Sequence, residues 1–158
     1  MNNWRHFWIW MLVALGLDQL SKVAIVHMLG LKTLIVVEVW RPYLVLRMGW
    51  NRGINFGLFS ADGDAGRWVL IAISVIICAV VIWWVRSETR ALAWVSAGLL
   101  VGGALGNVVD RVIYGAVADF LNMSCCGFDN PYVFNLADIA IFAGAGGMIL
   151  FTGQKNEA

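Results

Sequence analysis

The stretch Gly106-Asn107-Val108-Val109-Asp110-Arg111 closes a long, glycine-rich apolar run that begins near Ala91. The length and apolar character of this run predict a helix. On a helix, Asn107 shares a face with Asp110 and Arg111, because residues three and four positions apart are neighbours. The run therefore ends in a group of polar side chains on one face.

A strip of glycines leads along the same helix to the carboxylate. Gly98, Gly102, Gly106 and Asp110 follow one another at intervals of four residues. In lipid, small residues at this spacing allow a second helix to approach closely, and an ionisable residue inside a membrane helix is a candidate for function. The strip therefore predicts a helix interface that ends at a candidate site.

Two further carboxylates follow in the chain. Asp119 lies in Ala116-Val117-Ala118-Asp119-Phe120, and Asp138 ends the stretch Phe134-Asn135-Leu136-Ala137-Asp138. In the second stretch, Asn135 and Asp138 again share a helical face and open another apolar run. We expect these polar groups to organise the chemistry of the chain.

Composition and segment length indicate a membrane protein. Of the 158 residues, 61% are hydrophobic and 13% charged, whereas soluble domains contain about 25% charged residues. Trp68–Val85 and Ala91–Val109 contain no charged side chain, and each approaches the roughly 20 residues that cross about 30 Å of hydrocarbon. The chain is therefore an integral membrane protein. Its formal net charge of +1 gives no reason to expect a nucleic-acid partner.

Four transmembrane helices are expected within a single domain of residues 1–158. The expected spans are about 7–28, 68–85, 91–113 and 132–152. The first span contains Asp18 and Lys22, whose spacing of four lets them form an ion pair on one helix face. A structural ion pair is the simpler interpretation of these two residues, and a catalytic role is the alternative.

The segment of about residues 31–65 has a different composition and predicts a small β-lobe. Thr33–Val39 and Tyr43–Met48 are rich in β-branched and aromatic residues, which favours two strands. An open sheet edge is not tolerated facing lipid, so the lobe is expected outside the membrane. Tyr114–Pro131 is expected to be a loop or a partly helical re-entry. The predicted fold class is an all-α membrane protein of four transmembrane helices, with the β-lobe between the first two.

The candidate catalytic residues are carboxylates. The sequence offers no convincing nucleophile and no metal-binding cluster. No cluster of His, Cys and Glu has the spacing of a zinc site, and no serine stands in a nucleophile motif. Asp110, Asp119 and Asp138 remain. Two neighbouring carboxylates can share one proton, so that the ionised one activates water and the protonated one polarises a carbonyl group. Such aspartyl-protease chemistry needs no metal or cofactor. The alternative is that these Asp and Asn residues cap the third and fourth helices or bridge helices structurally.

Five short motifs in the same order resemble those of the bacterial lipoprotein signal peptidases (signal peptidase II). They are Asp18-Gln19 with Lys22, Asn51-Arg52-Gly53 before Phe56-Gly57, the stretch from Gly106 to Arg111, Ala118-Asp119-Phe120, and the stretch from Phe134 to Asp138. Each motif is weak alone, but five in order are specific.

The resemblance implies an aspartyl endopeptidase of the bacterial inner membrane. Such an enzyme removes the signal peptide of a prolipoprotein immediately before the cysteine that carries diacylglycerol. The implied catalytic pair is Asp119 and Asp138, near the periplasmic face, with both chain termini cytoplasmic. The implied partners are the lipid-modified substrate, membrane lipid and the inhibitor globomycin, and a monomer is expected.

The resemblance also assigns supporting roles. The residues implied to position substrate, inhibitor or the catalytic pair are Asn51, Asn107, Asp110, Arg111 and Asn135. The lobe corresponds to the family's β-cradle, and Tyr114–Pro131 to its flexible periplasmic helix. Ile54-Asn55 and Ile139 depart from the family pattern, which affects fine contacts and not the reaction class.

Two other interpretations remain open from the sequence. A small proton-coupled carrier or channel would use Asp18, Lys22 and Asp138 as a relay, and a purely structural membrane subunit would leave the Asn/Asp pairs unexplained. Counting Lys and Arg near the expected helix ends weakly opposes cytoplasmic termini, so charge alone leaves the orientation unresolved.

Overall fold

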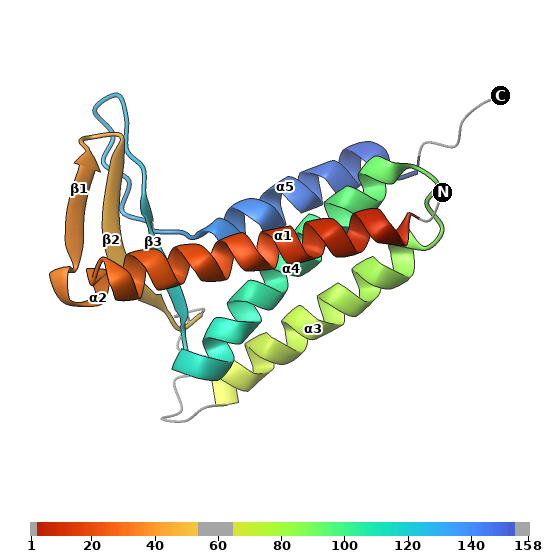
Figure 1. The fold of residues 1–158 in the computed structure, drawn as a ribbon, viewed down its shortest axis with the longest axis horizontal. Helices are drawn as coiled ribbons and strands as arrows, with labels where there is room; N and C mark the ends of the chain where they lie inside the picture. The colour runs from red at the N-terminus through yellow and green to blue at the C-terminus, as the bar shows by residue number, and fades with distance from the viewer. Residues whose placement is uncertain (1–2, 54–64, 154–158) are drawn as a thin grey trace.

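The computed structural model describes residues 3–53 and 65–153 and folds them as a bundle of long helices with a small sheet at one end (Figure 1). Ile54, Asn55, Phe56 and Gly57 of the second motif lie outside the described residues. The elements in chain order are α1 (Trp4–Lys22), which continues as a π-helix η1 (Val23–Met28), then α2 (Leu31–Leu34), β1 (Val36–Trp40), β2 (Leu44–Asn51), α3 (Ala65–Val85), α4 (Ala91–Tyr114), β3 (Val117–Asn122) and α5 (Leu136–Phe151).

Helix α4 is the centre of the bundle. It packs against α1, α3 and α5, and it contributes more buried residues than any of these helices. Its glycine strip faces α1: a Cβ atom on Gly98 would lie 2.5 Å from the carbonyl oxygen of Phe7, and one on Gly106 would lie 2.5 Å from Oδ2 of Asp18. The predicted close approach of a second helix is therefore confirmed, and that helix is α1.

The sheet is antiparallel, with the strand order β1-β2-β3. In the pairing of β2 with β3, Gly49 lies opposite Asp119 and Asn51 lies opposite Val117. A cluster of apolar side chains packs the sheet against η1 and α2. Its buried members are Val26, Leu31, Leu46, Ala118 and Phe120. The sheet therefore carries Asn51 and Asp119 to the end of the bundle.

Two expected strands of the lobe are confirmed, but the sheet has a third strand that was not expected. Thr33 belongs to the short helix α2, so β1 begins later than predicted. The expectation of a loop or partly helical re-entry over Tyr114–Pro131 is confirmed only in part: residues 123–131 lie outside any helix or strand, but Val117–Asn122 form β3 and residues 115–131 contain no helix. Nearly all of β3 is buried, so it lacks the alternation that marks a strand. Its partner β2 is also far away in sequence.

Among the described residues, three helices are long and apolar enough to cross a membrane: Trp4–Met28, Ala65–Val85 and Ala91–Tyr114. Helix α5 is apolar but has 16 residues, or roughly 24 Å at 1.5 Å per residue. The span expected at 132–152 is shortened because Phe134 pairs with Leu121 of β3 and Asn135 caps the helix. The multi-pass membrane architecture is confirmed, and the expected count of four spans is not.

We expect the close packing of α5 on α4 to depend on Gly144. A Cβ atom there would lie 2.5 Å from the backbone nitrogen of Leu100 and 2.6 Å from the carbonyl oxygen of Ser96. Gly144→Ala should therefore destabilise the protein by about 1–3 kcal/mol through overpacking. The matched control is Gly146→Ala in the same helix, where a Cβ would have no neighbour within 4 Å. Thermal unfolding of both variants in detergent micelles tests this, and equal melting temperatures would contradict it.

Candidate active site

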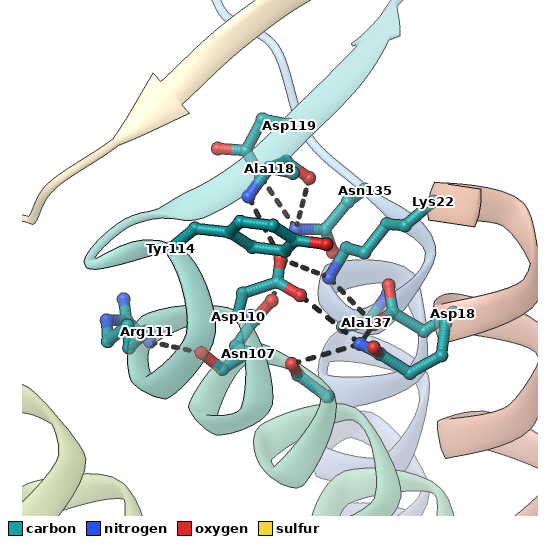
Figure 2. Close-up of polar contacts among 12 residues, drawn as sticks. Asp18, Lys22, Asn107, Asp110, Arg111, Tyr114, Ala118, Asp119, Asn135 and Ala137 are labelled. Carbon is teal, nitrogen blue, oxygen red and sulfur yellow. Dashed lines mark hydrogen bonds and ion pairs between the residues drawn. The ribbon is translucent and has the colours of Figure 1, made fainter. Parts of the chain in front are cut away.

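A buried ion cluster joins α1 to α4 (Figure 2). The Lys22 Nζ atom lies 2.7 Å from Oδ2 of Asp18 and 2.8 Å from Oδ2 of Asp110, and the three side chains are at most 5% exposed. The predicted pair of Asp18 and Lys22 is confirmed. The contact of Lys22 with Asp110 joins two helices, since Lys22 comes from α1 and Asp110 from α4.

Gln19 completes this cluster. Its side-chain amide donates hydrogen bonds to Oδ2 of Asp18 at 3.1 Å, to Oδ1 of Asp110 at 3.2 Å and to the carbonyl oxygen of Gly106 at 3.3 Å. The absence of a side chain on Gly106 leaves the space that the Asp18 carboxylate occupies. Sequence reasoning quoted Gln19 in a motif but gave it no role. Its spacing of three from Lys22 was the available signal, because this spacing places both on one helix face.

The cluster also binds the backbone of two other elements. The amide N–H of Ala118 in β3 donates to Oδ2 of Asp110 at 2.9 Å, and that of Ala137 in α5 donates to Oδ1 of Asp18 at 3.0 Å. The cluster of Asp18, Lys22 and Asp110 therefore contacts β3 and α5 as well as α1 and α4.

Asp119 projects from β3 and is 2% exposed. Its Oδ2 accepts a hydrogen bond from Nδ2 of Asn51 at 3.1 Å, and its Oδ1 accepts one from Nδ2 of Asn135 at 2.6 Å. Burial, with a further contribution from the negative charge of Asp138, raises the pKa of Asp119 to about 6, although both amides and the charge of Lys22 act in the opposite direction. Asp119 therefore holds a proton more readily than an exposed carboxyl group does.

Asp138 occupies the first turn of α5. Its Oδ2 accepts the backbone N–H of Asn135 at 3.2 Å, while the Asn135 side chain accepts the backbone N–H of Asp138 at 2.9 Å. This reciprocal pair is a capping box. The structural interpretation of Asn135 and Asp138 as cap residues is thus confirmed. The capping box uses only the Oδ2 atom of Asp138. The Oδ1 atom accepts a second hydrogen bond, from Nδ2 of Asn107 at 3.0 Å.

Two asparagines connect the carboxylates. Nδ2 of Asn135 lies 2.6 Å from Asp119 and 3.2 Å from Oδ1 of Asn107, and Asn107 in turn donates to Asp138. Asn135 is completely buried and Asn107 nearly so. The structure therefore brings Asp119 and Asp138 into one hydrogen-bonded network, with each carboxylate held by neutral donors.

Arg111 lies beside this network without a direct hydrogen bond to either carboxylate among the described residues. Its Nη1 donates to the carbonyl oxygen of Asn107 at 3.4 Å, and its buried Nε has no hydrogen-bond partner within the described part of the chain. Its charge nevertheless acts on Asp119, Asp138 and Asp110. Arg111 therefore places a positive charge next to the pair.

The expected site residues converge at the sheet end of the bundle. The hydrogen-bonded network consists of Asn51, Asn107, Asp119, Asn135 and Asp138. Asp110 belongs instead to the adjacent ion cluster. In residues 3–53 and 65–153, His, Cys, Asp and Glu side chains form no group of three or more that could hold a metal ion. The chemistry that these residues offer is proton transfer by two coupled carboxyl groups in unlike surroundings.

Comparison with known proteins agrees with this geometry. A family model described as signal peptidase (SPase) II matches residues 10–153. The chain is 42% identical to the lipoprotein signal peptidase of Methylorubrum extorquens, over 95% of this chain and 86% of that protein. It is 40% identical to that of Caulobacter vibrioides, over 92% and 86%. A solved structure described as a bacterial membrane enzyme superposes with a TM-score of 0.75 at 26% identity, covering 90% of this chain and 88% of the other. The chain therefore belongs to the signal peptidase II family and is a membrane protease.

Proposed function

We propose that the protein is an aspartic endopeptidase that removes the signal peptide from diacylglyceryl-modified prolipoproteins, with Asp119 and Asp138 as its catalytic pair. The names of its relatives support the substrate class. The observation that carries the assignment is the link between the two carboxylates through Asn135: its side-chain amide donates to Asp119 and its backbone N–H donates to Asp138. Only Asp119 of the pair is fully buried. Asp18 and Asp110 also share a donor, Gln19, but both of these carboxylates are fully buried.

The unlike surroundings divide the roles of the pair. Asp119 is the acid of the pair, because its pKa, raised to about 6, lets it hold a proton more readily than an exposed carboxyl group does. The Asp138 carboxylate takes a proton from water as the water oxygen attacks the scissile carbonyl carbon. Asp119 donates its proton to the carbonyl oxygen, which forms a tetrahedral diol. Asp138 then protonates the leaving nitrogen, and Asp119 recovers its proton as the C–N bond breaks.

The neighbouring residues hold this arrangement. Asn51 and Asn135 donate to Asp119, and Asn107 donates to Asp138. Neutral amides orient the carboxylates without supplying a charge that would ionise both. Arg111 lies close enough to offset negative charge that develops on the substrate. Globomycin-type inhibitors are proposed to bind the same groups, and the protein is proposed to act as a monomer without a cofactor.

The proposed location is the bacterial inner membrane, with the site near the periplasmic face and both termini cytoplasmic. The start of α1 and the end of α5 lie at the same end of the bundle, opposite the sheet (Figure 1). This arrangement supports a crossing by the short helix α5. The charge count opposes it only weakly, since Arg41 in the lobe is paired with Glu38 at 2.9 Å.

Asp119→Asn and Asp138→Asn should each abolish cleavage, because an amide neither donates nor accepts the proton as a carboxyl group does. The assay is purified, detergent-solubilised protein with a diacylglyceryl-modified prolipoprotein, with and without globomycin. Near-UV circular dichroism checks that each variant is folded. If either folded variant keeps a tenth of the wild-type turnover, the catalytic pair is wrong.

The pH dependence of kcat/KM should show an alkaline limb with an apparent pKa of about 6, since ionisation of Asp119 removes the general acid. Asn51→Ala removes a donor that favours the ionised form, so it should move this limb to higher pH. Thr33→Ala, which removes an exposed hydroxyl of the lobe, is the control and should leave the limb in place. A limb that moves to lower pH in Asn51→Ala would contradict the role of Asp119 as the acid.

The lipid on the substrate should act mainly on the rate. Burying a methylene group contributes about 0.8 kcal/mol, but the acyl chains are buried both in the bilayer and against the helices. They therefore fix the depth of the scissile bond more than they add affinity. Removal of the diacylglyceryl group should lower kcat more than it raises KM, measured by titrating each substrate up to saturation in lipid nanodiscs. Equal maximal rates would contradict this mechanism.

A further inference from the structure

Each candidate catalytic aspartate is preceded by a residue whose backbone amide is bound to the buried ion cluster. Ala118 precedes Asp119, and its N–H donates to Asp110 at 2.9 Å. Ala137 precedes Asp138, and its N–H donates to Asp18 at 3.0 Å. The same relation thus occurs twice, on a strand and on a helix that are unrelated in local structure.

Lys22 joins these two contacts. Its Nζ atom lies 2.7 Å from Asp18 and 2.8 Å from Asp110, so both carboxylates bind one ammonium group. A continuous path of short contacts then runs from the backbone beside Asp119, through the cluster, to the backbone beside Asp138 (Figure 2). Gln19 bridges the same two carboxylates a second time.

We propose that Lys22 is a positioning residue that sets the separation of Asp119 and Asp138. It holds strand β3 through Asp110, which binds Ala118, and helix α5 through Asp18, which binds Ala137. This inference rests on the proposed function, in which those two aspartates are the catalytic pair. It assigns to the ion cluster a role in the reaction in addition to the attachment of α1 to α4.

The charges of the cluster explain why a cation is needed at this point. Asp18 and Asp110 are both fully buried and repel each other. Without Lys22, their repulsion would push them apart. This movement would displace the two backbone amides that they hold, and a displacement of about 1 Å at a catalytic group can lower the rate roughly 100-fold.

Lys22 also acts on Asp119 through its charge. The charged groups that influence Asp119 come from three elements: Asp138 on α5, Lys22 on α1, and Arg111 on α4. Lys22 favours the ionised form of Asp119, and its loss should therefore raise the pKa of that carboxyl group. This effect gives the inference a second readout, the pH profile, which reports whether Lys22 acts on the catalytic pair.

The test uses a variant that keeps the net charge of the cluster. Lys22→Met alone would leave two unpaired buried carboxylates, and the protein could fail to fold for that reason. Lys22→Met combined with Asp18→Asn removes one charge of each sign, and the Asn oxygen can still accept the N–H of Ala137. The matched control is Arg41→Met combined with Glu38→Gln, which removes an exposed ion pair of the lobe.

The expected result is a folded double variant with kcat lowered about 100-fold, KM within roughly threefold of the wild type, and the alkaline limb of kcat/KM moved to higher pH. The control should have the wild-type kcat and pH profile. All proteins are assayed at full length in detergent micelles with the lipid-modified prolipoprotein, and kcat is expressed per folded molecule.

A folded double variant with the wild-type kcat and an unmoved limb would overturn the inference. If it does not fold, Lys22→Met with Asp110→Asn is the second charge-balanced variant, judged by the same criteria. Failure of both to fold would show that the cluster serves folding alone and would also overturn it. Asp119→Asn and Asp138→Asn are assayed alongside. Their activity would contradict the proposed function itself, whereas their inactivity beside a normal double variant would contradict only the role of Lys22.

Discussion

The burial of the Lys22 ammonium group between Asp18 and Asp110 is the constraint on which the rest of the structure depends. Removing one partner from a buried ion pair typically costs about 3–5 kcal/mol, because the remaining charge is left without compensation. Helix α1 therefore has one acceptable register along α4, the one that brings Lys22 to Asp110. The glycine strip of α4 makes this register sterically accessible, since a side chain at Gly106 would occupy the space of the Asp18 carboxylate.

The structural and the chemical interpretations of the polar residues are compatible. Asn135 and Asp138 form a capping box, which satisfies backbone groups at the start of α5. The same Asn135 side chain also donates to Asp119. One side chain therefore caps helix α5 and orients the carboxylate of Asp119. A helix start is a suitable place for this function, because it needs polar side chains for its own stability and lies at the edge of the apolar bundle.

The arrangement also separates this protein from a carrier. Asp18 and Lys22 bind each other, Asp110 and backbone groups in a buried cluster. Within the described part of the chain, neither side chain makes a hydrogen bond or ion pair with the Asp138 carboxylate. Membership of a protease family agrees with that geometry. Strand β3 also helps to form the catalytic network, because it places Asp119 between Asn51 on β2 and Asn135 at the start of α5.

Local patterns in the sequence were sufficient for the three long apolar helices, the close helix interface along Gly98, Gly102 and Gly106, and the pair of Asp18 and Lys22. These features depend on residues that are near in the chain, so helical periodicity is sufficient to predict them. The motif order also identified the family and all the acids that converge.

The tertiary structure alone decided that Val117–Asn122 is a strand, that α5 begins at Leu136, and that Lys22 binds Asp110. It also revealed Gln19 and the amides of Ala118 and Ala137 as parts of the site. Gln19 and Asp110 are 91 positions apart in the sequence, and Asp18 and Ala137 are 119 positions apart. No local pattern encodes such pairings, because they arise only when the packing of α1 on α4 fixes which buried polar groups must satisfy one another.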